Sequence, residues 1–240
     1  MNVAVIIVAA GAGHRLGRAL PKALVPLAGR SLARRALDQA LACADVAHVV
    51  LVAPPTHLPQ ARALVTQAES SYVEVVAGGQ ERAESVARGL AVLRPDDGIV
   101  LVHDAARCLA PPDLFDRVIA AVRAGHGAVV PGMPVVDTIK HVDPQGRVVG
   151  TPDRASLRAI QTPQGFLREI LEAAHAPGGG GARSAAGGAV TDDAGMVEAA
   201  GGHVVVVPGD PRATKVTTPQ DLLALELALR EADGRPEARA

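Results

Sequence analysis

VAVIIVAAGAGHRLGRALPKALVPLAG, residues 3–29, is the stretch that decides the fold of this 240-residue chain. It begins with an apolar run over residues 3–8, and a glycine turn at Gly11 and Gly13 follows at once. A continuous apolar run of this length is typical of a parallel strand that is covered on both faces. The turn leads into a loop with basic side chains, among them Lys22. Because backbone N–H groups and cations both bind phosphate oxygens, the pattern indicates a phosphate site at the end of a buried strand.

Two common glycine fingerprints do not fit this turn. The dinucleotide fingerprint of NAD-dependent dehydrogenases needs a third glycine where this chain has Leu16, and it needs a helix that Pro21 would interrupt. The Walker phosphate loop needs Gly-Lys followed by Ser or Thr, a sequence that the chain lacks. Two interpretations remain from these residues: an irregular loop that wraps a polyphosphate with Arg15 and Lys22, or an ordinary turn with solvated arginines.

The composition excludes several classes of partner. A formal net charge of −1 gives no basic field for nucleic acid, and three aromatic residues cannot form a stacking platform for single strands. The N-terminal apolar run is too short to span a bilayer. Cys43 and Cys108 fit a reducing compartment better than a disulfide framework. We expect a cytoplasmic protein that acts on small molecules, with neither nucleic acid nor membrane as a partner.

Strand-like and helix-like segments alternate along the rest of the chain. This alternation predicts an α/β fold, a Rossmann-like doubly wound sheet that is mostly parallel, in a single domain over residues 1–232. Residues 233–240 are expected to form a disordered tail. Strands are predicted over residues 46–52, 73–76, 98–102, 127–131 and 204–207, and helices over 32–43, 58–68, 82–93, 114–124, 192–200 and 220–230, with a further helix starting within 161–166.

Residues 134–160 interrupt this alternation. Polar and apolar residues alternate here as in strands, and the turn DPQG at residues 143–146 marks a β-hairpin. A hairpin inserted into a parallel sheet cannot join its core, so we expect a β-hairpin arm that packs on a second subunit. The sequence therefore predicts a homodimer through the arm.

A pair of glycines follows the strand predicted over 73–76. Gly78 and Gly79 would let a ligand approach the backbone. Arg82 and Ser85 come next, on consecutive turns of a helix. In an open α/β sheet, ligands bind at this carboxyl edge, but an ordinary capped helix start explains the same spacing equally well.

Asp104 follows the most apolar predicted strand, 98–102, and has small neighbours. Mg²⁺ takes one or two carboxylates together with phosphate oxygens, so an aspartate at this edge is suited to hold it. Arg107 could pair with this carboxylate or with a phosphate. The alternative is an aspartate that only caps the next turn, and His103 is interpreted as structural.

Two acidic residues stand at the start of the helix predicted over 192–200. Thr191 is expected to cap this helix, with Asp192 and Asp193 in its first turn, where the helix dipole favours negative charge. Capping alone accounts for these acids.

Lysine is rare in this chain. Among 24 basic residues, lysine occurs only as Lys22, Lys140 and Lys215. Where arginine is otherwise used, a retained lysine indicates a position that needs a compact point charge. Compositional drift is the simpler explanation for any one of them, but all three fall within motifs.

Seven motifs follow one another along the chain: AAGAGHRLG with PK (9–22), GGQERAESV (78–86), HDAAR (103–107), PVVDTIK (134–140), TPQGF (162–166), TDDAG (191–195) and TKVTTPQDL (214–222). In this order they resemble the 2-C-methyl-D-erythritol 4-phosphate cytidylyltransferases. The resemblance implies a fold of the nucleotide-diphospho-sugar transferase type. It also implies a magnesium-dependent transfer of CMP from CTP to a polyol phosphate, 2-C-methyl-D-erythritol 4-phosphate. The products would be 4-diphosphocytidyl-2-C-methyl-D-erythritol and pyrophosphate.

The same resemblance implies a role for individual residues, with Mg²⁺ bound by Asp104. The arm would bring part of the acceptor site to the partner subunit. Arg15, Lys22 and Lys215 would act in catalysis, and Ala10, Gly11 and Gly13 would hold the triphosphate. Gly79 and Ser85 would contact the cytosine, and Ala105 would bind the nucleotide beside Asp104. The second substrate would be bound by Thr138, Arg154 and Thr162.

The chain departs from the family pattern in the arm, where Val136 stands in place of a usual arginine. This departure leaves open a cytidylyltransferase that acts on another alditol or sugar phosphate, such as ribitol 5-phosphate. A catalytically silent nucleotide-binding regulator is an answer of a different class.

Overall fold

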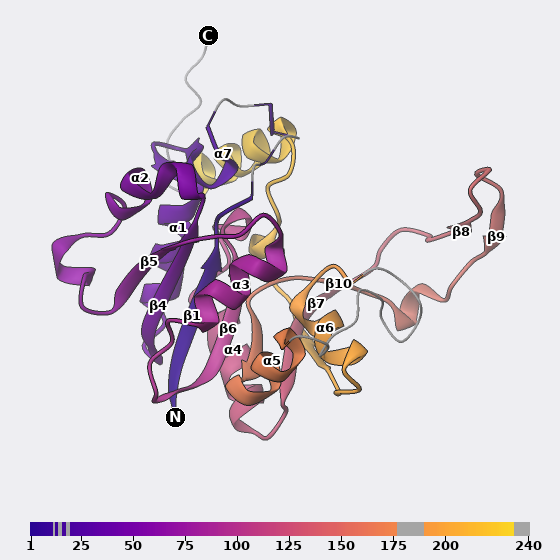
Figure 1. Ribbon diagram of the computed structural model, residues 1–240. Coiled ribbons are helices and arrows are strands. Elements are labelled where there is room, and N and C mark those ends of the chain that lie inside the picture. The colour runs from indigo at the N-terminus through magenta and orange to yellow at the C-terminus, as the bar shows by residue number, and fades with distance from the viewer. Residues whose placement is uncertain (12, 14–15, 18–19, 177–189, 233–240) are drawn as a thin grey trace, which may run out of the picture.

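A mostly parallel sheet forms the centre of the molecule, with helices on both faces (Figure 1). The structure is a computed structural model that describes residues 1–11, 13, 16–17, 20–176 and 190–232. The strands of the sheet are β1 (Asn2–Val8), β4 (Val46–Ala53), β5 (Val73–Ala77), β6 (Asp97–Asp104), β7 (Ala128–Pro134), β10 (Arg158–Ile160), β11 (Gln164–Leu167) and β12 (Val205–Pro208). Their order is β10-β7-β11-β6-β1-β4-β5, with β12 paired to β7. β1 is central, because it runs parallel to β4 on one side and β6 on the other.

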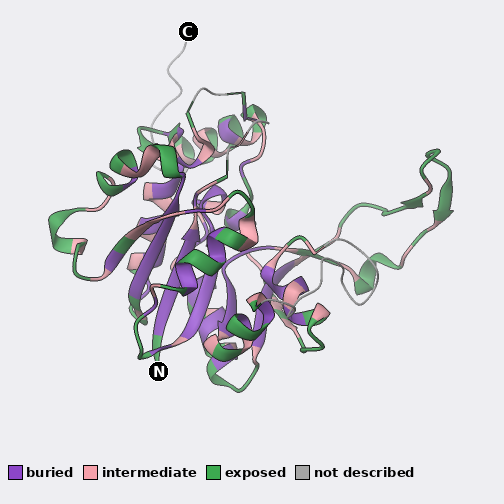
Figure 2. Ribbon diagram, viewed as in Figure 1, coloured by how far each residue is buried: buried purple, intermediate pink, exposed green. Residues whose placement is uncertain are grey.

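Helices cover the two faces of the sheet in separate groups. They are α1 (Leu32–Ala42), α2 (Leu58–Arg62), α3 (Arg82–Leu90), α4 (Pro112–Arg123), α5 (Arg168–His175), α6 (Asp193–Ala199) and α7 (Pro219–Ala232). Val3, Val5 and Ile7 of β1 join the core beneath α1 and α4. Ala4 and Ile6 join the core beneath α3 and α5, so both faces of β1 are buried (Figure 2). The predicted doubly wound α/β fold is confirmed. No helix in the described ranges combines the length and the apolar character that crossing a membrane requires.

The helix predicted over 58–68 is wrong beyond Arg62. α2 ends there, and the chain continues into the 3-10 turn η4 (Gln67–Glu69). The carboxylate of Glu69 accepts a hydrogen bond from the backbone N–H of Thr66 at 2.8 Å. In a longer helix, the Thr66 N–H would donate to a backbone carbonyl of the helix. Here the side chain of Glu69 accepts it instead.

β11 is a strand that the sequence interpretation missed. Residues 161–166 do not start a helix; β11 runs antiparallel to both β6 and β7, and the helix begins only after it. Gly165 permits this insertion, because a Cβ there would overlap the side chain of Val118 in α4. Phe166 is fully buried beside it. A strand of four residues is too short to show a clear period, which explains the error.

A hairpin projects away from the sheet, formed by β8 (His141–Val142) and β9 (Val148–Gly150) (Figure 1). Its residues are mostly exposed (Figure 2). The carboxylate of Asp143 closes the turn by accepting hydrogen bonds from the N–H groups of Gln145 and Arg147. The predicted hairpin is therefore present, and its conformation is held by contacts within itself.

The bounds predicted for the arm, 134–160, need correction at both ends. β7 extends to Pro134, and β10 joins the main sheet as an antiparallel neighbour of β7. The arm is therefore the segment 135–157, and the name is used below for these residues. The predicted tail, 233–240, lies outside the described residues.

Candidate active site

Four segments meet at the carboxyl edge of the sheet and enclose a cavity of about 240 Å³. β1 leads into the glycine turn, β5 is followed by Gly79, β6 ends at Asp104, and Lys215 comes after η7 (Pro211–Ala213). Ligands bind at this edge in open α/β sheets. Arg15 lies outside the described residues. The other predicted residues that line the cavity are Ala10, Gly11, Gly13, Lys22, Gly79, Ser85, Asp104, Ala105 and Lys215.

Gly13 packs directly against Lys22. Its φ of +67° lies in the left-handed region, and a Cβ at this position would overlap the Cβ of Lys22. Glycine is therefore required here by both conformation and packing. Lys22 starts the 3-10 turn η2 (Lys22–Leu24) just after Pro21. This close contact supports the irregular loop over an ordinary turn, because it fixes a cation beside the glycines.

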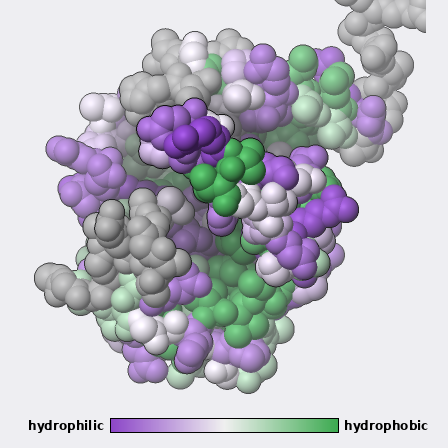
Figure 3. Space-filling view, turned by 90° about the vertical axis from the view of Figure 1, so that its right-hand side faces the viewer, coloured by the Kyte–Doolittle hydropathy of each residue, from purple (hydrophilic) through white to green (hydrophobic). Residues whose placement is uncertain are grey.

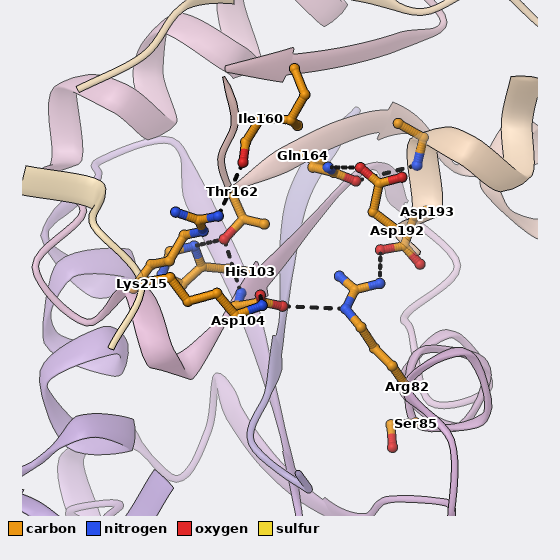
Figure 4. Close-up of polar contacts among 12 residues, drawn as sticks. Arg82, Ser85, His103, Asp104, Ile160, Thr162, Gln164, Asp192, Asp193 and Lys215 are labelled. Atoms are coloured by element: carbon orange, nitrogen blue, oxygen red, sulfur yellow. Dashed lines mark hydrogen bonds and ion pairs between the residues drawn. The ribbon is translucent and has the colours of Figure 1, made fainter. Parts of the chain in front are cut away.

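Asp104 lies between two cations (Figure 4). Lys215 Nζ is 2.6 Å from its Oδ2, and Arg82 Nε is 3.3 Å from its Oδ1. Burial alone would raise the pKa of Asp104, but the charges of Arg82 and then Lys215 hold this pKa well below its ordinary value. The carboxylate is therefore charged and faces the cavity, rather than acting only as a cap of the next turn.

Thr162 fixes the backbone of Asp104 from behind. Its Oγ1 accepts a hydrogen bond from the Asp104 N–H at 3.0 Å and lies 3.1 Å from His103 Nδ1. This second contact joins the Thr162 hydroxyl to the ring of His103, and the tautomer of His103 sets which of the two donates. Burial lowers the pKa of His103 to about 4, which keeps the ring neutral and able to accept. His103 is structural, as expected, and Thr162 positions Asp104 in addition to any contact with substrate.

A second cavity, of about 250 Å³, lies beside the first. Arg82, Asp104 and Lys215 line both cavities, so three charged side chains form their common boundary. Thr162 belongs to the second cavity. The arrangement offers space for two ligands that meet at one carboxylate and two cations. The other residues that line the second cavity are Arg107, Ile160, Gln161, Gln164, Thr191 and Asp192.

Asp193 supports the site from outside, a role that the sequence interpretation missed. Asp192, rather than Thr191, caps α6 by accepting the N–H of Gly195 at 2.9 Å. Asp193 is fully buried and pairs with Arg82 Nη1 at 2.6 Å. Burial would raise the pKa of Asp193, but Arg82 lowers it below its ordinary value. The partners lie 111 residues apart in sequence, so no local pattern indicates the pair.

Arg107 also makes contacts that the sequence does not predict. Arg107 lines the second cavity but forms no direct ion pair with Asp104, and its Nη1 donates to the carbonyl of Ala213 at 2.7 Å. Its Nη2 donates to the carbonyl of Ile160 at 3.0 Å. Arg107 thus ties the segment before Lys215 to β10.

The arm residues expected at the acceptor site lie elsewhere in this single chain. Thr138 and Arg154 line neither cavity. Arg154 is exposed and donates to the carbonyl of Val136 at 2.7 Å, and Lys140 donates to Thr151 at 2.8 Å. The structure therefore brings Thr162 to the site but not the two arm residues.

The carboxylate of Asp104 is suited to a magnesium ion only together with phosphate oxygens. In the described residues, His, Cys, Asp and Glu form no group of three or more that could hold a metal. Mg²⁺ does not require such a group, because it is commonly bound by one or two carboxylates plus the phosphates of a substrate. Asp104 faces the same cavity as the glycine turn and Lys22, so the donor set fits a metal that arrives with a triphosphate.

Comparisons with known proteins agree along nearly the whole chain. The family model of 2-C-methyl-D-erythritol 4-phosphate cytidylyltransferase matches residues 3–231. The enzyme of that name from Nocardia farcinica is 49% identical over 228 residues, which cover 95% of this chain and 94% of that protein. A bifunctional enzyme IspD/IspF from Clavibacter michiganensis is 51% identical over 235 residues; the match covers 96% of this chain but 55% of that longer protein.

Solved structures give the same result. The crystal structure of 2-C-methyl-D-erythritol 4-phosphate cytidylyltransferase from Thermus thermophilus superposes with a TM-score of 0.73 and 34% identity, covering 96% of this chain and all of that one. The 4-diphosphocytidyl-2C-methyl-D-erythritol synthase from Anaerococcus prevotii gives a TM-score of 0.79 at 27% identity, covering 95% of this chain and 98% of that one. With these matches and the shared motifs at the sheet edge, the chain belongs to the 2-C-methyl-D-erythritol 4-phosphate cytidylyltransferase family.

Proposed function

We infer that this chain transfers CMP from CTP to the phosphate of 2-C-methyl-D-erythritol 4-phosphate, a step of isoprenoid precursor biosynthesis. The products are 4-diphosphocytidyl-2-C-methyl-D-erythritol and pyrophosphate. The observation that carries this inference is the pair of cavities that meet at Asp104 and Lys215 in a chain of this family. Relatives that carry this name over their full length favour this acceptor over ribitol 5-phosphate.

CTP is assigned to the first cavity. Its triphosphate would lie against the backbone of Ala10, Gly11 and Gly13, with Arg15 and Lys22 supplying positive charge. The cytosine would lie near Gly79 and Ser85 at the far side of the same cavity. The contact that supports this placement is the hydrogen bond of 3.1 Å from the Gly79 N–H to Ser85 Oγ, which sets the shape of that side.

The acceptor phosphate can act as a nucleophile without a general base. The second pKa of a phosphate monoester is about 6, so the group is already a dianion near neutral pH. One of its oxygens forms a bond to the α-phosphorus of CTP, and the bond from that phosphorus to the pyrophosphate oxygen breaks. The electron pair leaves with pyrophosphate. Binding and orientation of two highly charged anions is therefore the main task of the protein.

Lys22 and Lys215 approach this reaction from its two sides, and Ala105 lies beside Asp104 in the first cavity. At 4 Å and an effective dielectric constant of 20, one unit charge contributes about 4 kcal/mol before desolvation. Lys215 would exchange Asp104 for the acceptor phosphate when substrates bind. Asp104 would then hold Mg²⁺ together with the triphosphate, and the ion would supply further neutralisation of negative charge.

We further propose that the enzyme is a homodimer whose arm reaches the acceptor cavity of the other subunit. The arm exposes Val136, Val142, Val148 and Val149, which are costly to leave in water and suited to an interface. Figure 3 looks at the side of the molecule from which the arm extends, and hydrophobic residues reach that surface among hydrophilic ones. In this arrangement Thr138 and Arg154 would bind the acceptor in trans.

The decisive experiment is pyrophosphate release with CTP and a panel of acceptors. We expect turnover of 2-C-methyl-D-erythritol 4-phosphate and little turnover of ribitol 5-phosphate; the reverse result would overturn the assigned acceptor. A silent regulator is tested by Lys22→Ala and Asp104→Ala in preparations that still bind CTP. If neither change reduces turnover, the active-site assignment is wrong.

A further inference from the structure

Arg82 lies between two carboxylates from distant parts of the chain (Figure 4). Its Nη1 is 2.6 Å from Asp193, and its Nε is 3.3 Å from Asp104. Asp104 lines both cavities, whereas Asp193 lines neither. The shorter contact of Arg82 is therefore made outside the site, and the longer one is made within it.

Asp193 is more deeply buried than Asp104. The side chain of Asp193 is fully buried, and its other oxygen lies 3.0 Å from Nε2 of His175, whose side chain is only 4% exposed. A buried carboxylate that loses its cation is strongly destabilised. Each carboxylate has a second partner, Lys215 for Asp104 and His175 for Asp193, but Asp104 faces the cavity whereas Asp193 lines neither cavity.

The charge of Asp193 thus determines how Arg82 is shared. Without that charge, the guanidinium could close on Asp104 with two N–H groups, the geometry that arginine prefers with a carboxylate. The single long contact of 3.3 Å from Arg82 to Asp104 Oδ1 would then become a two-point ion pair that holds the carboxylate more firmly. A divalent ion that arrives with a nucleotide would have to displace it.

We propose that Asp193 is a positioning residue: it retains Arg82 and thereby keeps the carboxylate of Asp104 available to a nucleotide-bound divalent cation. This inference rests on the proposed function, in which Asp104 receives magnesium with CTP. Asp193 acts through Arg82 and touches no substrate.

A crystal structure of Asp193→Asn tests the geometric step directly. Asparagine keeps the shape of the side chain and its ability to hydrogen-bond, but it lacks the charge. We expect Arg82 to turn from residue 193 and to pair with Asp104 through two nitrogens. An Arg82 that stays in place would overturn the proposal.

Calorimetric titration with CTP tests the consequence. The measured quantity is the CTP dissociation constant in EDTA divided by that in saturating magnesium. We expect Asp193→Asn to reduce this ratio about tenfold. The double variant Arg82→Gln, Asp193→Asn should restore it to within about twofold of the unmodified protein, because no guanidinium remains to occupy Asp104.

Asp97→Asn is the matched control. Asp97 is also fully buried, pairs with His48 at 2.7 Å, and lies at the opposite end of the same strand, β6. It should lower the melting temperature but leave the ratio unchanged. If Asp193→Asn fails to fold, Arg82→Lys decides, since a single ammonium should follow the buried carboxylate of Asp193 and preserve the ratio.

The outcomes separate this inference from the proposed function. An unchanged ratio in Asp193→Asn, or a reduced ratio in Arg82→Lys, would overturn the positioning role. If Asp193 only stabilised the fold, Asp193→Asn would weaken CTP binding by the same factor in EDTA and in magnesium. A ratio near one in the unmodified protein would instead contradict the magnesium site, and the position of Arg82 in the variant crystal would still decide the role of Asp193.

Discussion

The carboxyl edge of the sheet and the arm hold their polar residues in opposite ways. At the edge, Asp104 is fixed by a buried strand, by the Thr162 hydroxyl and by two cations. In the arm, Lys140 and Arg154 are exposed, and their hydrogen bonds to described residues stay within the arm. The edge residues are therefore held by contacts from several elements of the sheet, whereas the arm residues would meet a substrate only in the dimer proposed above. Changes at the edge should affect the reaction itself, and changes in the arm should depend on assembly.

Lys215→Ala should have the largest effect. It removes a charge from the boundary of the two cavities, so turnover should fall about 100-fold or more, as for the loss of other groups that stabilise transition-state charge. CTP affinity should change little. Steady-state pyrophosphate release and calorimetric CTP binding measure the two quantities. If the variant lost only CTP affinity, Lys215 would act on the nucleotide and the proposed role at the acceptor would be wrong.

The second effect is on stability at the buried edge. Burial lowers the pKa of His103 to about 4, below an unfolded value of about 6.5, so the unfolded chain binds this proton first. The stabilising contribution is complete above pH 6.5 and is lost as pH falls toward 4.

Urea unfolding at pH 7 and pH 5 measures this linkage. The protein should lose on the order of 2 kcal/mol more stability between these pH values than His103→Gln does. His141→Gln in the exposed arm is the matched control. Equal losses in the protein and in His103→Gln would show that His103 does not contribute.

Arg154→Ala should have a smaller effect and one that depends on assembly. The KM for the acceptor should rise about tenfold, which corresponds to the loss of one exposed charged contact, with CTP affinity unchanged. Mixing this variant with Lys215→Ala gives the sharper test. If the arm acts in trans, a mixed dimer contains one site with both residues intact, and activity returns on mixing. Without recovery, Arg154 does not act across subunits.

Lys140→Ala should have the smallest effect. The ammonium is exposed and, within the part of the chain that the structure describes, donates to Thr151 alone at 2.8 Å, so turnover should change less than about twofold. The same assay as for Lys215→Ala measures it, and a loss comparable to that variant would end the distinction between edge and arm.

The sequence predicts the edge well, because parallel strands bring their carboxyl ends to one side. Gly13, Lys22, Gly79 and Asp104 each follow a strand or its turn, so strand order alone gathers them. What the sequence cannot predict depends on single long-range contacts. Arg82 and the fully buried Asp193 form such a contact, and no periodic pattern or fixed spacing in the sequence indicates that they pair.

The errors at β10 and β11 have a related cause. Each strand is three or four residues long, and each runs against the direction of its neighbours. A short segment shows no clear period, and the alternation of strand and helix predicts only parallel strands. The boundaries predicted from the sequence therefore place the end of the arm too late and the start of the following helix too early.

The return of the arm through β10 and β11 has a mechanical consequence. The arm leaves from β7 and returns through β10, and the next residues are those around Thr162, whose hydroxyl holds the backbone of Asp104. The arm is therefore anchored directly beside the residues that position the carboxylate of Asp104. A contact made at its tip would therefore bear on two strands, β7 and β10, and β10 leads directly to the residue that holds Asp104.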